Sequence, residues 1–265
     1  MTNIGKYQDN FSEIFPEAAY SFDLRERKAR TMLAVLKDFV KTDVRRMTLL
    51  DLGSSTGIIA HYLACHFGRV MGVDVDRSAV HFAWQTSKRS NLSFGLVDGM
   101  NLAFKHNMFD VVICAHIYEH VSDPVKLLEQ IYRVLKPGGL CYFAADNRLW
   151  WWEPHYRLPF LAWLPRLMAH HYLRLAGKGD FYEERLLSRR SLRRLVGKFA
   201  VIDYTPKIIR NPNLFYADYM LREGSVKFKF ANLVVKYAYW LCPGYIWLLQ
   251  KRNGQIPKTK FWRST

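Results

Sequence analysis

Two short stretches of this chain hold side chains whose types and spacing could do chemistry. The first, Asp51-Leu52-Gly53-Ser54-Ser55-Thr56-Gly57, follows an apolar run that predicts a strand and precedes a predicted helix. Such a turn presents backbone N–H groups to a nucleotide-type ligand. The second, His116-Ile117-Tyr118-Glu119-His120, holds two imidazoles and a carboxylate after another apolar run. Imidazole can move a proton near neutral pH, so this stretch is a candidate for catalysis.

The glycine spacing in the first stretch decides between two kinds of nucleotide ligand. A dinucleotide fingerprint, G-x-G-x-x-G, needs glycine at positions 53, 55 and 58, but this chain has Gly53, Ser55 and Ile58. The pyrophosphate-binding version is therefore excluded. Gly53 and Gly57 still leave the backbone open to a ligand. Asp74 ends the next predicted strand, where a carboxylate can accept hydrogen bonds from both ribose hydroxyls of an adenosine.

Further motifs occur in order along residues 45–148. D-L-G-S-S-T-G resembles motif I of class I S-adenosylmethionine (SAM) methyltransferases, with Ser55 at its middle glycine. Later motifs match the same family: Asp98-Gly99-Met100 at its adenine-binding position, Phe109-Asp110-Val111-Val112 as its fourth strand, and Leu135-Lys136-Pro137-Gly138-Gly139 as its turn before strand five. A Rossmann-like domain that binds another ligand is the alternative. The resemblance implies SAM as cofactor, bound by Asp51, Gly53, Ser54, Ser55, Gly57, Asp74, Val75, Asp98, Gly99, Met100 and Ala115.

The second stretch resembles the quinone-biosynthesis O-methyltransferases within this class. Their segment reads E-x-x-E-H-V-x-D-P, and here His116 replaces the first glutamate while Glu119 and His120 match. The resemblance implies that this segment closes over the methyl donor and orients or deprotonates an acceptor hydroxyl, with His116, Glu119 and His120 as catalytic candidates. Alternatively, Glu119 and His120 cap the next helix and brace the loop. Some such enzymes are thought to hold a divalent cation, but we predict no metal because His116 replaces a glutamate.

The expected reaction is direct transfer of a methyl group from the sulfonium to a nucleophile, with positioning and desolvation as the main catalytic effects. The chain lacks the Asn/Asp-Pro-Pro-Tyr motif of enzymes that methylate base amino groups, and no cysteine lies where a cytosine-C5 nucleophile is expected. Oxygen is therefore the expected target atom.

The charge of the chain is distributed unevenly between its two halves. Residues 1–146 hold 17 Lys and Arg and 16 Asp and Glu, whereas residues 147–265 hold 22 and 7. A basic surface suits an anionic partner such as a membrane face, a phosphorylated lipid or nucleic acid. We expect a hydrophobic or lipid-linked small-molecule acceptor, with an anionic membrane surface as a further candidate partner. Two alternative functions remain open: an RNA methyltransferase and a non-catalytic SAM-binding partner protein. The second half also holds seven of the eight tryptophans, Trp150, Trp151, Trp152, Trp163, Trp240, Trp247 and Trp262.

The pattern of apolar runs predicts an α/β fold: a Rossmann-like, seven-stranded, mostly parallel sheet with helices on both faces and an inserted helical lid after strand five. We expect a SAM-binding core over residues 1–146, a basic and aromatic acceptor lid over 147–187, and the rest of the same domain over 188–265. Strands are expected at residues 47–52, 69–73, 92–97, 109–114, up to 143, 199–204 and 245–250.

Localisation is expected to be cytoplasmic, with peripheral attachment at the inner membrane face as an option. The first 16 residues lack the apolar region of a signal peptide, and the scattered cysteines are typical of reduced, buried thiols. Residues 230–250 are apolar, but Lys236 interrupts them and Pro243-Gly244 breaks them. We therefore expect a buried helix over residues 228–241 and a core strand, with interfacial attachment as the alternative.

Overall fold

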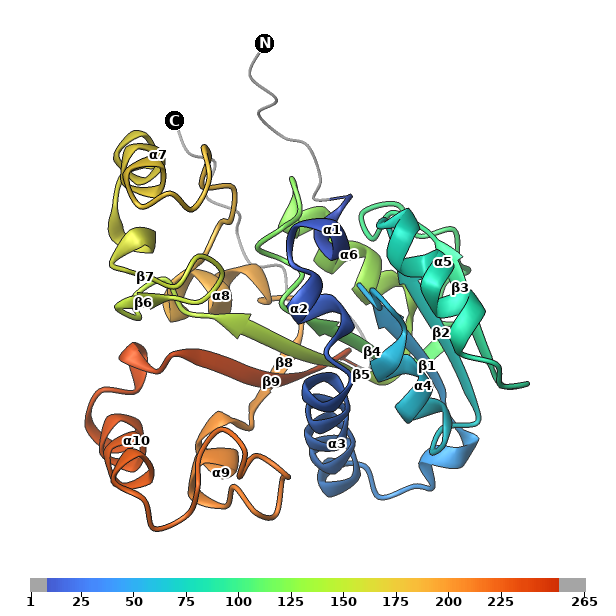
Figure 1. Cartoon of the computed structure of the whole chain (residues 1–265). Helices are drawn as coiled ribbons and strands as arrows, with labels where there is room; N and C mark the ends of the chain where they lie inside the picture. The colour runs from blue at the N-terminus through green and yellow to red at the C-terminus, as the bar shows by residue number, and fades with distance from the viewer. Residues whose placement is uncertain (1–8, 253–265) are drawn as a thin grey trace, which may run out of the picture.

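The computed structural model describes residues 9–252, which build one seven-stranded sheet in the order β3-β2-β1-β4-β5-β9-β8 (Figure 1). Neighbouring strands are parallel except β5–β9 and β8–β9, which are antiparallel. The mostly parallel, seven-stranded sheet is thereby confirmed. Its strands are β1 (Thr48–Leu52), β2 (Arg69–Asp74), β3 (Leu92–Leu96), β4 (Phe109–Ala115), β5 (Leu135–Asp146), β8 (Ala200–Asp203) and β9 (Gly244–Gln250).

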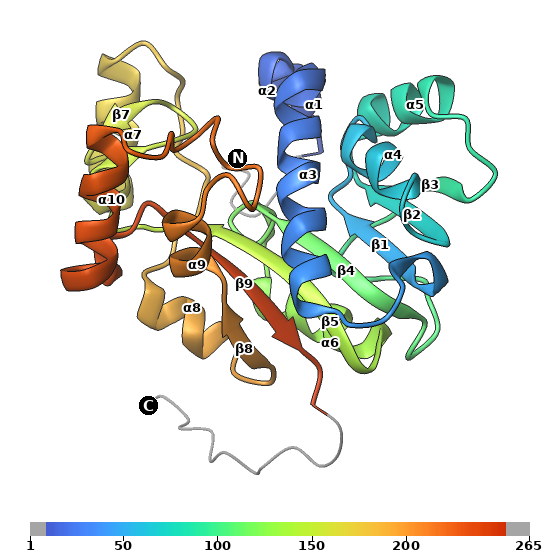
Figure 2. The same cartoon turned by 90° about the horizontal axis from the view of Figure 1, so that it is seen from below.

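Helices cover both faces of the sheet and give it two cores (Figures 1 and 2). The alternating side chains of β1 show the division, because Leu49 packs into one core and Leu50 into the other. Burial on both faces explains why the parallel strands read as continuous apolar runs. The core that holds Leu50 also takes α6 (Pro124–Val134) and α8 (Arg189–Leu195), and the core that holds Leu49 takes α3 (Phe22–Phe39), α4 (Ile58–Ala64) and α9 (Thr205–Arg210). The helix α5 (Arg77–Thr86) packs beside β2 and β3.

The strand order places the predicted site residues at one edge. The chain runs from β1 to β2 on one side, whereas β4 pairs with β1 on the other. Ligands of open α/β sheets bind where the order reverses, beyond the carboxyl ends of the strands. Asp51, Asp74, Ala115 and Asp146 lie at the ends of β1, β2, β4 and β5.

The segment 147–187 packs around a small apolar cluster of its own. It contains a hairpin of β6 (Trp152–Glu153) and β7 (Leu158–Pro159), the 3-10 turn η2 (Leu161–Trp163) and α7 (Arg166–Leu175). Its ends meet at a bridge between Asn147 and Leu187. Two short helices that the apolar pattern did not predict, α1 (Phe11–Ile14) and α2 (Pro16–Tyr20), precede α3.

The expected buried helix near the carboxyl end is wrong. Helix α10 (Val226–Tyr237) has no buried residue, and a separate 3-10 turn, η3 (Tyr239–Leu241), follows it. The mean hydropathy of this segment suggested a core position, but α9 already covers the sheet here, so much of the apolar surface of α10 faces solvent. Within residues 9–252, no helix is both long enough and apolar enough to cross a bilayer.

The expectation of four buried cysteines is wrong for Cys65, which is exposed at the end of α4. Cys114, Cys141 and Cys242 are buried, and all four are free thiols. Trp262 lies outside the described residues.

Candidate active site

The turn after β1 is held close to β2 by its backbone. The amides of Gly53 and Ser54 both donate to the carbonyl of Val73, at 2.8 and 3.0 Å. Gly53 and Gly57 adopt the left-handed conformation, with φ of 77° and 75°. A Cβ atom at Gly53 would collide with the side chain of Ile117, which belongs to the histidine-containing loop. The glycines therefore allow this turn to pack against both β2 and that loop.

Replacing Gly57 by alanine is expected to lower the free energy of unfolding by about 2–4 kcal/mol, the sum of left-handed strain and overpacking. The new Cβ would lie 2.6 Å from Phe94 Cζ and 2.8 Å from Ala83 Cβ. Urea denaturation measures the change. Gly177→Ala is the matched control, because Gly177 is also left-handed, with φ of 63°, but a Cβ there meets no atom within 4 Å. Equal losses in the two variants would contradict the packing argument.

Asp74 and Asp51 form an acidic pair beside this turn. The carboxylate of Asp74 accepts hydrogen bonds from the amides of Ser55 at 2.7 Å and Asp76 at 2.9 Å. Asp51 is buried, and its Oδ2 has no hydrogen-bond partner among residues 9–252. Burial raises the pKa of Asp51 to about 7, and nearby Asp74 adds to the rise. Asp51 thus keeps an acceptor oxygen that the described residues do not fill, which suits a hydroxyl or ammonium group of a ligand.

Arg25, from α3, was missed at the level of the sequence and reaches this acidic pair. Its guanidinium donates to Ser55 Oγ at 3.3 Å and to the carbonyl of Ala18 at 2.9 Å. Burial lowers the pKa of Arg25, while the charges of Asp51 and Asp74 oppose that shift. No local signal marks this arginine, because it is one of several charged residues on an amphipathic helix.

The two amino-terminal helices also belong to the site. The amide of Ser12 in α1 donates to Asp76 Oδ2 at 2.7 Å, and Thr56 Oγ1 donates to the carbonyl of Ala19 in α2 at 2.7 Å. Phe11 and Phe15 line the same cavity as Asp74. This segment therefore closes one side of the pocket.

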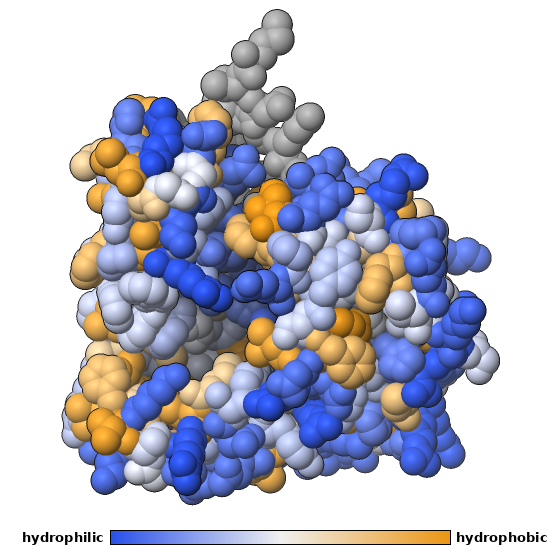
Figure 3. All heavy atoms as spheres, viewed as in Figure 1, coloured by the Kyte–Doolittle hydropathy of each residue, from blue (hydrophilic) through white to orange (hydrophobic). Residues whose placement is uncertain are grey.

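The cavity at the ends of the strands has a volume of about 1440 Å³. Figure 3 shows the hollow opening on the side of the molecule that carries α7 and α10. Pockets for one drug-sized ligand usually occupy about 300–1,000 Å³, so this one has room for a cofactor and an acceptor together. The predicted residues that line it are Asp51, Gly53, Ser55, Asp74, Val75, Gly99, Ala115, His116 and His120. Those that do not line it are Ser54, Gly57, Asp98, Met100 and Glu119.

His116 forms a charged cluster with two carboxylates in the wall of this cavity. Its Nδ1 lies 3.1 Å from Asp146 Oδ2 and 3.5 Å from Glu119 Oε1, and its φ of 57° is left-handed. Burial alone would lower the pKa of His116, but Asp146 and Glu119 outweigh it and raise the pKa to about 10. The same pairing holds the pKa of Asp146 below its usual value against the effect of burial. His116 is therefore an imidazolium at neutral pH, whereas a general base must be neutral.

The pairing of the charged His116 with Asp146 and Glu119 makes the free energy of unfolding depend on pH. A histidine with a folded-state pKa near 10 stabilises the fold fully below its unfolded value of about 6.5, and this contribution disappears as pH rises through 10. The difference in melting temperature between the wild-type protein and His116→Asn is therefore expected to shrink between pH 6.5 and pH 10. Comparison with this variant cancels other groups that titrate in the range, such as His155. A difference that stays constant with pH would contradict the charged pair.

His120 has the opposite character. Its Nδ1 finds no hydrogen-bond partner within the described part of the chain. Burial, with smaller effects from His155 and His116, lowers the pKa of His120 to about 3, so the ring stays neutral. The capping alternative does not hold, because Asp123 caps α6 by accepting from the amides of Val125 and Lys126 at 3.0 Å each.

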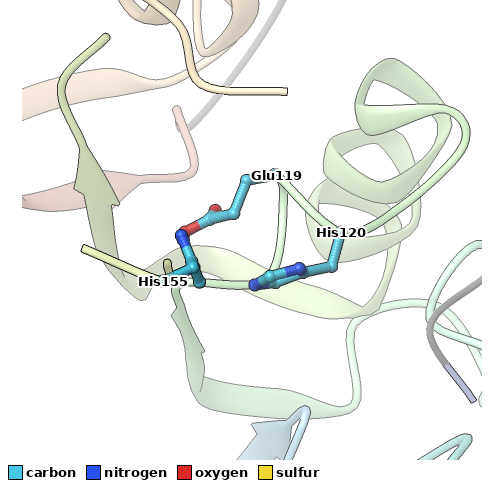
Figure 4. Close-up of side chains that lie close together, drawn as sticks. All are labelled: Glu119, His120 and His155. Carbon is cyan, nitrogen blue, oxygen red and sulfur yellow. The ribbon is translucent and has the colours of Figure 1, made fainter. Parts of the chain in front are cut away.

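Figure 4 shows Glu119, His120 and His155 directed toward one another, although they come from the loop after β4 and from the insert. One donor atom from each lies within 4.8 Å of the others, and the same holds for His116, Glu119 and Asp146. His155 already pairs with Glu153 Oε1 at 2.7 Å. Mg²⁺ prefers oxygen ligands, so two imidazoles and one carboxylate do not fit it. In the second cluster both carboxylates pair with His116, and the charged ring of this histidine cannot bind a metal. We therefore derive no catalytic step through a metal at either cluster.

Comparison with known proteins bears on this geometry. Residues 50–143 match a family model described as a methyltransferase domain. A ubiquinone biosynthesis O-methyltransferase of Coxiella burnetii is 30% identical over 102 residues, which are 38% of this chain and 44% of the relative. The enzyme of the same description from Hydrogenovibrio crunogenus is 28% identical over 185 residues, covering 65% of this chain and 73% of the relative. This chain thus spans less than half of the Coxiella relative.

The fold has solved counterparts. An S-adenosylmethionine-dependent methyltransferase from Mesorhizobium loti superposes with a TM-score of 0.54 at 15% identity, covering 83% of this chain and 97% of that one. The fold of this chain is therefore that of the class I SAM-dependent methyltransferases, and residues 50–143 are similar to a methyltransferase domain. Within that class its sequence is similar to the ubiquinone biosynthesis O-methyltransferases.

Proposed function

We propose that this protein transfers the methyl group of SAM to an oxygen atom of a hydrophobic or lipid-linked small molecule. The supporting observation is one large cavity, which joins the acidic pair at the end of β1 and β2 to the histidine-containing loop. Between the acidic pair and the histidine-containing loop, the cavity walls are largely apolar, and the insert contributes Trp150 and Trp151 to them. Such a space suits an apolar acceptor beside a charged cofactor.

The hydrogen-bond donors and acceptors next to β1 and β2 indicate that SAM binds at this end of the cavity. Asp74 accepts hydrogen bonds from the ribose hydroxyls, and Gly99, the residue of the segment 98–100 that lines the cavity, lies against the adenine. Gly53 and Ser55 let the backbone approach the methionine portion, and Gly57 keeps the turn packed against Phe94 and Ala83. Arg25 pairs with the methionine carboxylate, because a half-buried guanidinium offers several donors to a planar anion. Asp51 accepts from its ammonium group through the oxygen that has no partner in the protein.

The reaction proposed is an in-line displacement. The carbon–sulfur bond of the sulfonium breaks as the bond from the acceptor oxygen to the methyl carbon forms, and S-adenosylhomocysteine leaves. The acceptor hydroxyl must lose one proton. The charged His116, held by Asp146, stabilises the developing oxyanion, and the proton leaves to water. The neutral His120, with a pKa of about 3, is too weak a base to keep this proton and instead orients the acceptor hydroxyl. Glu119 positions His116, since its carboxylate lies 3.5 Å away and is fully buried.

The acceptor class is tested with purified protein, methyl-labelled SAM and three candidate acceptors. These are a phenol with an apolar tail, the aniline of the same shape, and RNA. We expect label on the phenol, at least about 10²-fold less on the aniline, and none on RNA. Preferred labelling of the aniline would overturn the choice of oxygen. Label on RNA that ribonuclease releases would favour the RNA methyltransferase alternative. SAM binding without transfer to any acceptor in a cell extract would favour the non-catalytic one.

A further inference from the structure

Helix α10 exposes a continuous apolar stripe to solvent. Val226, Phe230, Leu233 and Tyr237 are each more than half exposed, and their spacing of four, three and four residues places them on one face. Trp240, in the following turn, is also more than half exposed. Single exposed apolar residues are ordinary on protein surfaces, but a stripe along a whole helix is typical of an interaction surface.

The charges carried by helix α10 are all positive. Lys227, Lys229 and Lys236 lie on α10, which carries no Asp or Glu. Among residues 9–252, neither Lys229 nor Lys236 forms an ion pair. An apolar stripe flanked by unpaired lysines complements a surface that is anionic outside and apolar beneath, as a bilayer of acidic lipids is.

A second exposed cluster lies on the same side of the molecule. Trp151, Trp152, Phe160 and Trp163 of the insert are each more than a third exposed and contact one another in a chain of ring pairs. Figures 1 and 2 place the β6–β7 hairpin, α7 and α10 along one side of the molecule. Figure 3 shows hydrophobic residues gathered over α10 and mixed with hydrophilic ones over α7, with the hollow between the two helices. Tryptophan and tyrosine favour the headgroup level of a bilayer, where one side of the ring is apolar and the other wet.

The stripe also adjoins the cavity that holds the proposed acceptor. Lys227, Phe230, Ala231 and Val234 of α10 line that cavity, and so do Trp151 and Arg157 of the insert. One helix therefore contributes both to the cavity wall and to the exposed face. A lipid-linked acceptor could enter from a bilayer without crossing water.

We propose that α10, with the exposed aromatic residues of the insert, docks this protein on the surface of an anionic lipid bilayer so that the cavity opens toward the membrane. The helix lies in the interface with Leu233, Tyr237 and Trp240 inserted and its lysines at the level of the phosphates. The role of docking, which is to bring a lipid-linked acceptor to the cavity, rests on the proposed function. Membrane binding itself is measured without turnover.

The test is sedimentation of the full chain with vesicles of phosphatidylcholine alone or mixed with phosphatidylglycerol. We expect binding to the mixed vesicles and little to phosphatidylcholine alone. The double variant Leu233→Ser/Tyr237→Ser should bind the mixed vesicles about tenfold less or worse, and Lys229→Glu about fivefold less or worse. Trp240→Ala should also weaken binding, whereas Trp84→Ala, an equally exposed tryptophan on α5, should not. Equal binding by wild-type protein and the α10 variants would overturn the proposal, as would equal binding to both kinds of vesicle.

Failure of docking and failure of the proposed function are separable. The double variant changes residues that do not line the cavity, so it should methylate a water-soluble phenol at the wild-type rate. Lost vesicle binding with that rate retained supports the docking surface. Unchanged vesicle binding by the double variant overturns the docking surface, even where methyl transfer is observed.

Discussion

Replacing Asp74 by asparagine is expected to weaken SAM binding by about 10²-fold or more while the protein stays folded. Two hydrogen bonds from the ribose to a charged carboxylate contribute about 1.5–3 kcal/mol each, and the neutral amide recovers only part of this. The variant keeps an oxygen that can accept from the amide of Ser55 or Asp76. It also removes the charge that helps to raise the pKa of Asp51. Calorimetric titration with SAM measures the affinity, and a thermal melt measures the fold.

Asp110→Asn is the matched control for this variant. Asp110 is also held by hydrogen bonds to the protein, from Thr48 and from Lys136 at 2.7 Å, but it does not line the cavity. We expect Asp110→Asn to lower stability and leave SAM affinity unchanged. Wild-type affinity in Asp74→Asn would show that the ribose does not bind at the end of β2.

Replacing His116 by asparagine is expected to lower kcat by about 10²–10³-fold with little change in SAM affinity, because a positioned charge that stabilises a developing oxyanion contributes that much. Asparagine tolerates the left-handed backbone at this position better than most residues do. The change leaves Glu119 buried without its counter-charge, so stability should fall as well. Single-turnover transfer from bound SAM measures the chemical step apart from binding.

The double variant His116→Asn/Glu119→Gln separates the two effects. It removes the uncompensated charge and should recover stability relative to His116→Asn, while turnover stays low. Glu119→Gln alone provides the baseline for the loss of that carboxylate. Recovery of turnover together with stability in the double variant would show that His116 has only a structural role.

Much of the fold could be predicted because its signals are local. Parallel strands covered on both faces must be apolar along their whole length, so β1, β2 and β4 could be located from composition alone. The turn at Gly53–Gly57 and the carboxylate Asp74 follow from what a strand–turn–helix unit needs to bind a nucleotide.

The features that sequence reasoning missed depend on tertiary contacts. Arg25 and the helices α1 and α2 reach the site from before the first strand, and nothing in their own sequence directs them there. The pairing of His116 with Asp146 joins the ends of two strands 30 residues apart, so the charge on this histidine could not be foreseen. The apolar composition of α10 indicated burial, since sequence alone does not distinguish a core face from an exposed one.

The most direct test of the central claim is the stoichiometry of methyl transfer. Purified protein is incubated with methyl-labelled SAM and a lipid extract, and the S-adenosylhomocysteine formed is compared with the label that enters the organic phase. We predict equal molar amounts of the two, and neither product above background with Asp74→Asn. SAM bound at the wild-type site with no S-adenosylhomocysteine formed, or S-adenosylhomocysteine formed with all label left in the aqueous phase, would contradict a methyltransferase that acts on a hydrophobic acceptor.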